Sequence, residues 1–261
     1  MKKSKLTVLL SLPLLLLSSC NNEKPKEYIG IISAMDNEIA LLLKQAEIEE
    51  ERVVADTTYY VGTLKDKPVV ITHSGIGKIR ASSGATTLFN TWSISKLIFT
   101  GVAGGLRDEE KVLDQVIGTS VIEHDYGSLT DEGFTWCGGD PGKLEPGEHY
   151  ECDKSLVDLA YESALSIMDS SHIFKGCIAT GDQFIASSDY VRYLVDNFDA
   201  YACEMEGAAI GKICVAYEVP FVLLRTLSDK ADGEAHESYE NFMDLAAEQS
   251  NKIVMKMLES L

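Results

Sequence analysis

The chain has 261 residues, with 41 acidic against 23 basic side chains and a formal net charge of −18 at neutral pH. A surface this acidic repels nucleic acid and anionic lipid headgroups, and no block of lysine or arginine offers a groove that could follow a phosphate backbone. Composition and charge therefore argue against a nucleic-acid-binding protein.

The N-terminal residues 1–19 are predicted to be a lipoprotein signal peptide. Three lysines precede the apolar run 6–17, which is too short to span a bilayer as a stable helix. The order Leu-Ser-Ser-Cys at 17–20 resembles a bacterial lipobox, which implies that Cys20 carries a lipid; an ordinary secretory signal with a chance cysteine is the alternative. Residues 20–27 would then be a tether, and we expect an extracytoplasmic protein that reaches a membrane only through that lipid.

The remaining residues, 28–261, have the length expected of one α/β domain of about 235 residues with a substantial core. Five cysteines remain there, and their spacing matches no zinc site. Cys137 and Cys152 flank a loop rich in Gly and Pro, and an extracytoplasmic location would permit a disulfide between them. For the cysteines at 177, 203 and 214 the alternative expectation is buried free thiols.

Apolar β-branched runs alternate with amphipathic stretches along the whole domain, a pattern that predicts an α/β fold with a mostly parallel sheet covered on both faces. The predicted strands are Tyr28–Ser33, Arg52–Asp56, Tyr59–Leu64, Val69–His73, Lys96–Thr100, Val116–Glu123, Ile173–Thr180 and Phe221–Leu227. The predicted helices are Asn37–Ala46, Lys78–Thr91, Lys154–Met168, Asp189–Asn197, Gly207–Tyr217 and Tyr239–Leu258. Residues 125–150, rich in Gly, Pro and acids, are expected to form a long functional or mobile loop.

Glycines and acids directly follow five of the predicted strands. The segments are Met-Asp-Asn-Glu at 35–38, Gly-Ile-Gly at 75–77, Gly-Val-Ala-Gly-Gly at 101–105, Gly-Asp-Gln-Phe at 181–184 and Ser-Asp at 228–229. In an open α/β sheet, ligands bind at the carboxyl ends of the strands. The sequence therefore predicts a binding site at this edge, assembled from distant parts of the chain.

Six segments in this order carry a resemblance to a known family. They are IGIISAMDNEI (29–39), HSGIGKIRAS (73–82), TGVAGGL (100–106), ATGDQFI (179–185), CEMEGAAI (203–210) and RTLSDKAD (225–232). The chain resembles the 5′-methylthioadenosine/S-adenosylhomocysteine nucleosidases of the nucleoside phosphorylase superfamily over nearly the whole domain. The resemblance implies a three-layer αβα fold around a twisted mixed sheet, a homodimer, and hydrolysis of a 5′-thio-substituted adenine nucleoside by water.

The same resemblance assigns roles to individual residues. Glu38 matches the general base that activates water, and Asp229, preceded by the substrate-binding Ser228, matches the acid that protonates adenine N7. Glu206 matches the carboxylate that binds the ribose hydroxyls. The remaining expected substrate contacts are Met205 against the sugar, Phe184 and Ile185 around the base, Ile76 and Gly77 beside the sugar, and Tyr239 near the 5′ substituent.

The proposed chemistry needs this division of labour. Adenine is a poor leaving group, so an acid must reach N7 as the glycosidic bond lengthens. The sugar then becomes positively charged, which favours nearby carboxylates and a water on the opposite face. Two vicinal ribose hydroxyls are a donor pair suited to one carboxylate. No step requires a metal or an organic cofactor.

Several assignments have alternatives. Each of the three carboxylates lies near the start of a predicted helix, where acids also serve as caps. Glu204 could contact the ribose or brace Arg225, and His124 with Asp125 resembles a family His-Asp pair, although a lone surface histidine is the commoner case. Val102 stands where many relatives carry a small hydroxyl residue, so a polar contact there is missing or replaced.

Three other functions compete with the nucleosidase. A purine nucleoside phosphorylase would need cations for phosphate, whereas the loop at 35–38 is acidic. A futalosine-type nucleosidase would share the catalytic residues and differ in the 5′ pocket, and the divergent segment 125–150 leaves the 5′ group open. A lipoprotein that binds nucleosides without turnover is the third alternative, because a fold does not guarantee function.

Overall fold

The computed structural model describes residues 26–137 and 149–261. The predicted signal peptide, Cys20, most of the tether and residues 138–148 of the predicted loop lie outside the described residues. Within the described part of the chain, no helix is long and apolar enough to cross a membrane.

A mixed sheet forms the centre of the domain. Its strands run in the order β11-β10-β6-β12-β5-β1-β4-β3-β2, with β9 beside β6. Their bounds are β1 Tyr28–Ser33, β2 Glu47–Val54, β3 Thr57–Leu64, β4 Lys67–His73, β5 Ile94–Gly105, β6 Gln115–Glu123, β9 Tyr150–Glu151, β10 Ile173–Thr180, β11 Ala200–Glu204 and β12 Phe221–Asp229. Parallel pairing joins β4, β1, β5 and β12, and also β6, β10 and β11.

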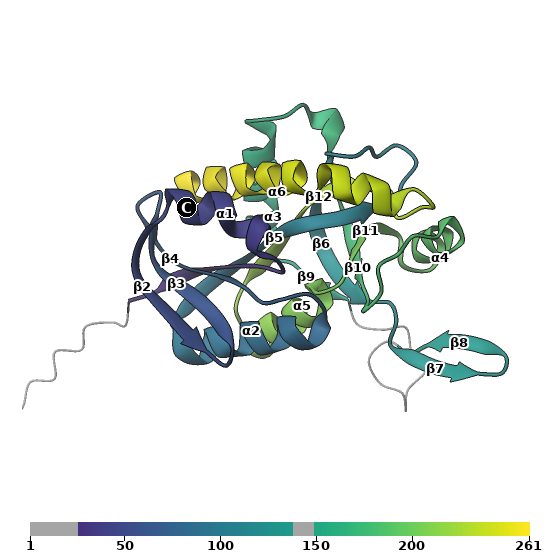
Figure 1. Cartoon of the computed structure of the whole chain (residues 1–261), viewed down its shortest axis with the longest axis horizontal. Coiled ribbons are helices and arrows are strands. Elements are labelled where there is room, and N and C mark those ends of the chain that lie inside the picture. The colour runs from purple at the N-terminus through teal and green to yellow at the C-terminus, as the bar shows by residue number, and fades with distance from the viewer. Residues whose placement is uncertain (1–25, 138–148) are drawn as a thin grey trace, which may run out of the picture.

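Helices cover both faces of this sheet (Figure 1). On one face α6 (Ala235–Ser260) packs against α1 (Asp36–Gln45) and α3 (Lys154–Leu165), and on the other α2 (Lys78–Thr91) packs against α5 (Gly207–Ala216). The short helix α4 (Ser188–Phe198) lies beside β10 and β11. This arrangement confirms the predicted three-layer αβα fold.

The central strands are continuous apolar runs because both of their faces are buried. All nine residues of β12 are buried, because β5 and β6 flank it and helices cover its two faces. The edge strand β2 is different: seven of its eight residues are exposed, and four of them are glutamates. Charged side chains of this kind discourage pairing with another sheet edge.

The structure corrects several predicted boundaries. Strand β11 was not predicted, because it is only five residues long and its sequence, AYACE, has no β-branched residue. Helix α6 begins at Ala235, one turn before the predicted Tyr239. Strand β2 was predicted as Arg52–Asp56 but begins at Glu47 and ends at Val54. The prediction missed its first half because an exposed edge strand lacks the apolar alternation that marks a half-buried strand.

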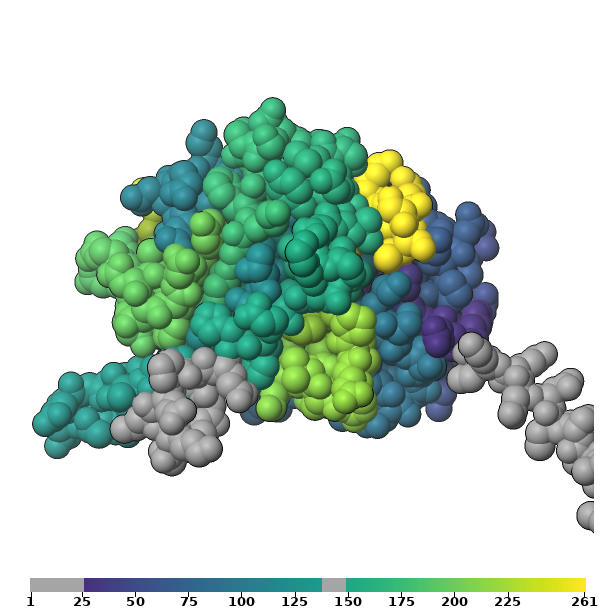
Figure 2. All heavy atoms as spheres, turned by 180° about the vertical axis from the view of Figure 1, so that it is seen from behind, coloured from purple at the N-terminus to yellow at the C-terminus, as the bar shows by residue number. Residues whose placement is uncertain are grey.

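The predicted loop 125–150 contains a hairpin. Strands β7 (Gly127–Thr130) and β8 (Gly133–Trp136) pair with each other and project from the body of the domain (Figures 1 and 2). At its base, the Trp136 ring packs edge-on against Phe198, and its indole N–H donates to the Glu123 carbonyl at 2.6 Å. The prediction of one long loop was therefore wrong for the residues of β7 and β8.

Cys137 and Cys152 are both free and buried, so the suggested disulfide between them is absent from the structure. Each has its own surroundings, since the Cys137 amide bonds the Tyr126 carbonyl at the base of the hairpin, whereas the Cys152 amide bonds the Thr119 carbonyl of β6. The cysteines at 177, 203 and 214 are buried free thiols, as expected.

Candidate active site

A cavity of about 340 Å³ opens at the carboxyl ends of β1, β5, β11 and β12. Every predicted catalytic or substrate-binding residue except Gly77 lines it. Met35, Val102, Gln183 and Cys203 also line it and were not assigned a role from the sequence. The strand-end argument therefore located the cavity correctly.

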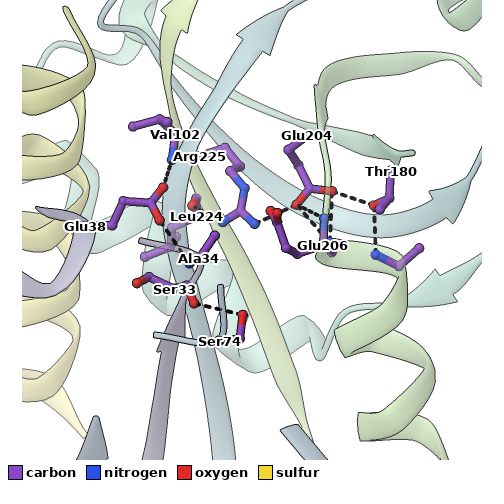
Figure 3. A network of polar contacts seen from close by, with 12 residues as sticks. Ser33, Ala34, Glu38, Ser74, Val102, Thr180, Glu204, Glu206, Leu224 and Arg225 are labelled. Carbon is purple, nitrogen blue, oxygen red and sulfur yellow. Dashed lines mark hydrogen bonds and ion pairs between the residues drawn. The ribbon is translucent and has the colours of Figure 1, made fainter. Parts of the chain in front are cut away.

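Glu38 lies in the first turn of α1, and its carboxylate turns back toward the strand ends (Figure 3). Oε2 accepts hydrogen bonds from the Ala34 and Met35 amides at 2.9 and 2.8 Å, and Oε1 accepts one from the Val102 amide at 2.9 Å. The residue is only 3% exposed. Burial raises the pKa of this carboxyl, and the positive charge of Arg225 together with the three amides opposes the rise.

Gly101 makes room for this carboxylate. A Cβ at that position would stand 2.6 Å from Glu38 Oε1, too close for any side chain. Glu38 both caps its helix and faces the cavity, so the structural and functional interpretations of this residue are compatible.

Asp229 is the last residue of β12 and lines the same cavity. Its Oδ1 accepts the Ala231 amide at 2.8 Å, and its Oδ2 accepts the Ser228 hydroxyl at 2.9 Å. Burial raises the pKa of Asp229, while these two hydrogen bonds lower it. A buried carboxyl with a raised pKa can hold a proton near neutral pH and donate it to a base nitrogen.

Glu206 stands directly before α5 and points into the same cavity. Its Oε1 accepts the Gly77 amide at 2.8 Å, which places Gly77 behind the carboxylate. Burial raises the pKa of Glu206, and the negative charge of Glu204 raises it further.

Glu204 braces Arg225, one of the two roles that the sequence allowed, and it also lines the cavity. Arg225 Nη2 donates to Glu204 Oε2 at 2.8 Å, and the Thr180 hydroxyl donates to Oε1 at 2.5 Å (Figure 3). The Gly207 amide donates to the same carboxylate. Arg225 itself is 1% exposed and lies over the Phe99 ring at 3.9 Å. Glu204 therefore shares its acceptor capacity between Arg225, Thr180 and the backbone amides at the start of α5.

Aromatic rings form one wall of the cavity. Phe184 stacks on His236 with ring centroids 4.5 Å apart and meets Tyr239 edge-on at 5.7 Å. The Tyr239 hydroxyl donates to Met35 Sδ at 3.3 Å. The sequence pointed to Phe184 and Tyr239, which line the cavity; His236 does not line it, but its ring stacks on Phe184, a contact that the sequence did not indicate.

His124 does not line the cavity. It is completely buried, contrary to the expectation of a surface histidine, and its Nδ1 lies 3.1 Å from the Tyr190 hydroxyl. Burial lowers the pKa of its imidazole. Asp125 instead accepts from the Lys78 ammonium group and the Asp182 amide.

The charged side chains that line the cavity are all acidic. Among the described residues, its lining contains the four carboxylates Glu38, Glu204, Glu206 and Asp229 and no lysine, arginine or histidine. The nearest strong cation, Arg225, is already paired with Glu204. Such a site favours a ligand with hydroxyl and amino donors, or a developing positive charge, and disfavours an anion.

Fold and site together define a protein of the phosphorylase superfamily, whose family model matches residues 28–259. The chain is 37% identical over 234 residues to a 5′-methylthioadenosine/S-adenosylhomocysteine nucleosidase of Bacillus thuringiensis, covering 89% of this chain and 99% of the relative. The chain belongs to this nucleosidase family, which confirms the resemblance drawn from the six segments.

Two solved structures show the same relationship. The nucleosidase of the same name from Neisseria meningitidis, in complex with methylthio-immucillin-A, matches with a TM-score of 0.81 and 34% identity over 90% of this chain and 100% of that one. A futalosine hydrolase of Helicobacter pylori matches with a TM-score of 0.82 and 32% identity over 90% of this chain and 99% of that one.

Proposed function

We propose that this protein hydrolyses the N-glycosidic bond of a 5′-thio-substituted adenine nucleoside, methylthioadenosine or S-adenosylhomocysteine, and releases adenine. The observation that carries this proposal is the convergence of Glu38, Glu206 and Asp229, all buried, on one cavity whose lining contains no cationic side chain from the described residues. The relatives that the chain matches over nearly their full length are nucleosidases of this kind, which supports the proposal.

Glu38 is the group we assign to activation of water. Its three amide hydrogen bonds hold the carboxylate in one orientation, and its raised pKa makes it a better proton acceptor than an exposed glutamate. The water loses a proton to Glu38 as its oxygen forms a bond to the anomeric carbon. The carboxylate also stabilises the positive charge that develops on the sugar.

Asp229 is the group we assign to departure of the base. In its protonated form it donates to adenine N7 while the C–N bond breaks, so the electron pair of that bond leaves with a base that is no longer an anion. The Ser228 hydroxyl and the Ala231 amide fix the carboxyl for this transfer. Glu206, with an accepting carboxylate beside the sugar region, takes the two ribose hydroxyls, and Phe184 supplies a flat surface for the base.

Phosphorolysis is the first alternative, and one assay separates it from hydrolysis. Phosphate would enter a cavity whose lining, among the described residues, holds acidic side chains and no lysine, arginine or histidine, so no cation there would bind it as the nucleophile. We expect adenine release from methylthioadenosine at the same rate with and without inorganic phosphate. Strict dependence on phosphate would overturn the hydrolase proposal, and binding of the nucleoside without any release of adenine would favour the non-catalytic alternative.

A futalosine-type substrate is the second candidate, favoured by the match to the Helicobacter pylori futalosine hydrolase. The two substrate classes share the ribose and differ at the 5′ group. In this chain Met35, Ile76 and Tyr239 are among the apolar and aromatic residues that line the cavity, and we expect such a lining to suit a thioether better than a polar tail. Comparing kcat/KM for methylthioadenosine and futalosine decides between them.

Two further expectations concern the state of the protein. We infer a homodimer, supported by the family resemblance and by the exposed Leu129 and Phe134 on the projecting hairpin. Sedimentation of the purified protein tests it.

We also infer lipid attachment at Cys20 in an extracytoplasmic location, supported by the lipobox-like sequence. Loss of membrane association in a Cys20→Ala variant tests the anchor, and salvage of external nucleosides would explain an active enzyme there.

A further inference from the structure

Lys78, the first residue of α2, joins three loops at the rim of the cavity. Its Nζ lies 2.6 Å from Glu123 Oε1 and 2.6 Å from Asp125 Oδ1, both at the end of β6. Asp182 Oδ2, in the loop after β10, lies 3.8 Å away. The Lys78 side chain is 18% exposed, so these contacts are partly shielded from solvent.

The backbone amides of Gly77 and Lys78 also bind two acidic side chains, those of Glu206 and Asp182. The Gly77 amide donates to Glu206 Oε1 at 2.8 Å, and the Lys78 amide donates to Asp182 Oδ1, also at 2.8 Å. Asp182 in turn donates its own amide to Asp125 Oδ2 at 2.7 Å. Gly77 has φ +96°, and a Cβ there would approach Asp182 Oδ1 to 3.1 Å, so this turn requires glycine.

Helix stability does not explain a lysine at this place. The positive end of the helix dipole makes a cation unfavourable in the first turn, and the first turn of α2 contains no acidic residue of its own. The compensating charges come instead from two other loops, one of which continues directly into Gln183, Phe184 and Ile185 of the cavity wall. The cluster therefore connects parts of the site and not parts of one helix.

We propose that Lys78 is a positioning residue, which ties the Ile76-Gly77 turn to the Asp182–Ile185 loop and thereby holds Glu206 in place for the ribose. This inference rests on the proposed function, because it assigns Glu206 to the sugar. Without the ammonium group, Glu123, Asp125 and Asp182 repel one another, and the turn that donates to Glu206 loses its anchor.

The ionisation of Glu206 is a second consequence. Its carboxylate is faced by the charges of Glu204, Arg225 and Glu38, and the Gly77 hydrogen bond lowers the pKa that burial raises. Displacing that amide raises the pKa of Glu206 again, so the ionised form that accepts ribose hydroxyls is reached only at higher pH.

The test compares Lys78→Met, Lys78→Arg and Asp182→Asn with wild-type full-length protein, using methylthioadenosine. For Lys78→Met we expect KM to rise about tenfold with kcat within about twofold, because the lost interaction contributes equally to substrate and transition-state binding. The acidic limb of the kcat/KM profile should move to higher pH. Lys78→Arg should restore most of the affinity, and Asp182→Asn, which keeps the shape of a half-exposed side chain, should raise KM in the same direction.

Lys154→Met is the matched control, because this exposed lysine pairs with Asp158 on α3, a helix that packs on the opposite face of the sheet from α2. It should leave KM and the pH profile unchanged. If Lys78→Met does not fold, as thermal unfolding would reveal, Asp182→Asn decides alone. Wild-type KM and pH profile in either folded variant would overturn the inference. If the wild-type protein releases no adenine, the proposed function is wrong. The role of Lys78 is then tested by the calorimetric affinity for methylthioadenosine, and a Kd that is unchanged in Lys78→Met would overturn this inference.

Discussion

The backbone amide of Val102 donates a hydrogen bond to Glu38, with 2.9 Å between the nitrogen and Oε1. This contact joins the C-terminal part of β5 to the first turn of α1, and it uses the main chain because the Val102 side chain offers no polar atom. Together with the Ala34 and Met35 amides on Oε2, it means that both carboxylate oxygens of Glu38 face N–H donors.

The variant Glu38→Gln should lose turnover and keep nucleoside binding. A neutral amide cannot take the proton of the attacking water, so kcat should fall by about 10²–10⁴-fold. Because one amide NH2 must face an N–H donor, the free energy of unfolding should fall by about 1–3 kcal/mol. Adenine release, calorimetric binding and thermal unfolding measure the three effects.

Glu49→Gln is the control for that variant, since this exposed glutamate on β2 pairs only with Lys26 among the described residues. Neither its activity nor its stability should change noticeably. A Glu38→Gln protein that keeps wild-type kcat would remove Glu38 from the role of general base.

The variant Asp229→Asn should be damaged most with poor leaving groups. Its side-chain oxygen can still accept the Ala231 amide and its NH2 can donate to the Ser228 oxygen, so the fold should be retained. Loss of the acid should lower kcat for methylthioadenosine by about 10²–10⁴-fold. A synthetic nucleoside with an activated leaving group should lose far less, and an equal loss for both substrates would argue against the acid role.

The variant Glu206→Gln should weaken ribose recognition in particular. Its oxygen can still accept the Gly77 amide, but the NH2 group cannot accept a ribose hydroxyl. KM for methylthioadenosine should rise about tenfold, the value of one lost hydrogen bond. The 2′-deoxy analogue should be nearly unaffected, so the wild-type preference for the ribonucleoside should shrink. A preference that stays intact in this variant would place the hydroxyls elsewhere.

The carboxylates of the site could be predicted from the sequence because of sheet geometry. Parallel strands bring their carboxyl ends to one edge, so Glu38 after β1 and Asp229 at the end of β12 had to lie near each other once the strands were recognised. The strands of buried, β-branched residues were recognised, but β5 was predicted to end at Thr100 and in fact continues to Gly105, through the glycines that we expected to follow it. The exposed edge strand β2 was recognised only in part and the short strand β11 not at all, since their pairing comes from their neighbours and not from their own residues.

Contacts between distant residues could not be predicted. The Tyr239 hydroxyl meets Met35 across 204 positions of sequence, and this depends on how α6 crosses the end of β1. The sequence suggested that Glu204 could brace Arg225 but did not show the contact, because that needed the position of β11, which had no signal of its own. Glu110 is a further case, because nothing in the acidic run Asp108-Glu109-Glu110 indicates which member is buried.

Glu110 predicts a pH effect on stability. Its side chain is inaccessible to solvent, its Oε2 accepts the Leu106 and Arg107 amides at 2.9 and 3.0 Å, and Oε1 has no partner among the described residues. Lys230 Nζ stands 4.0 Å from Oε2. Burial raises the pKa of Glu110 to about 7, and this outweighs the hydrogen bonds and the nearby lysine.

The direction of the effect follows from proton binding. Between pH 4.5 and about 7 the folded state holds the Glu110 proton while the unfolded chain releases it, so stability falls as the pH rises through this window. Glu110→Gln keeps an oxygen for the two amides and cannot ionise. Its stability relative to wild type should therefore be about equal at pH 4.5 and greater by up to about 3 kcal/mol at pH 8. Thermal unfolding at both pH values measures this, with the exposed neighbour Glu109→Gln as control. A wild-type-to-variant difference that does not change between the two pH values would mean that folding does not raise the pKa of Glu110, so that the two amides and Lys230 offset the effect of burial.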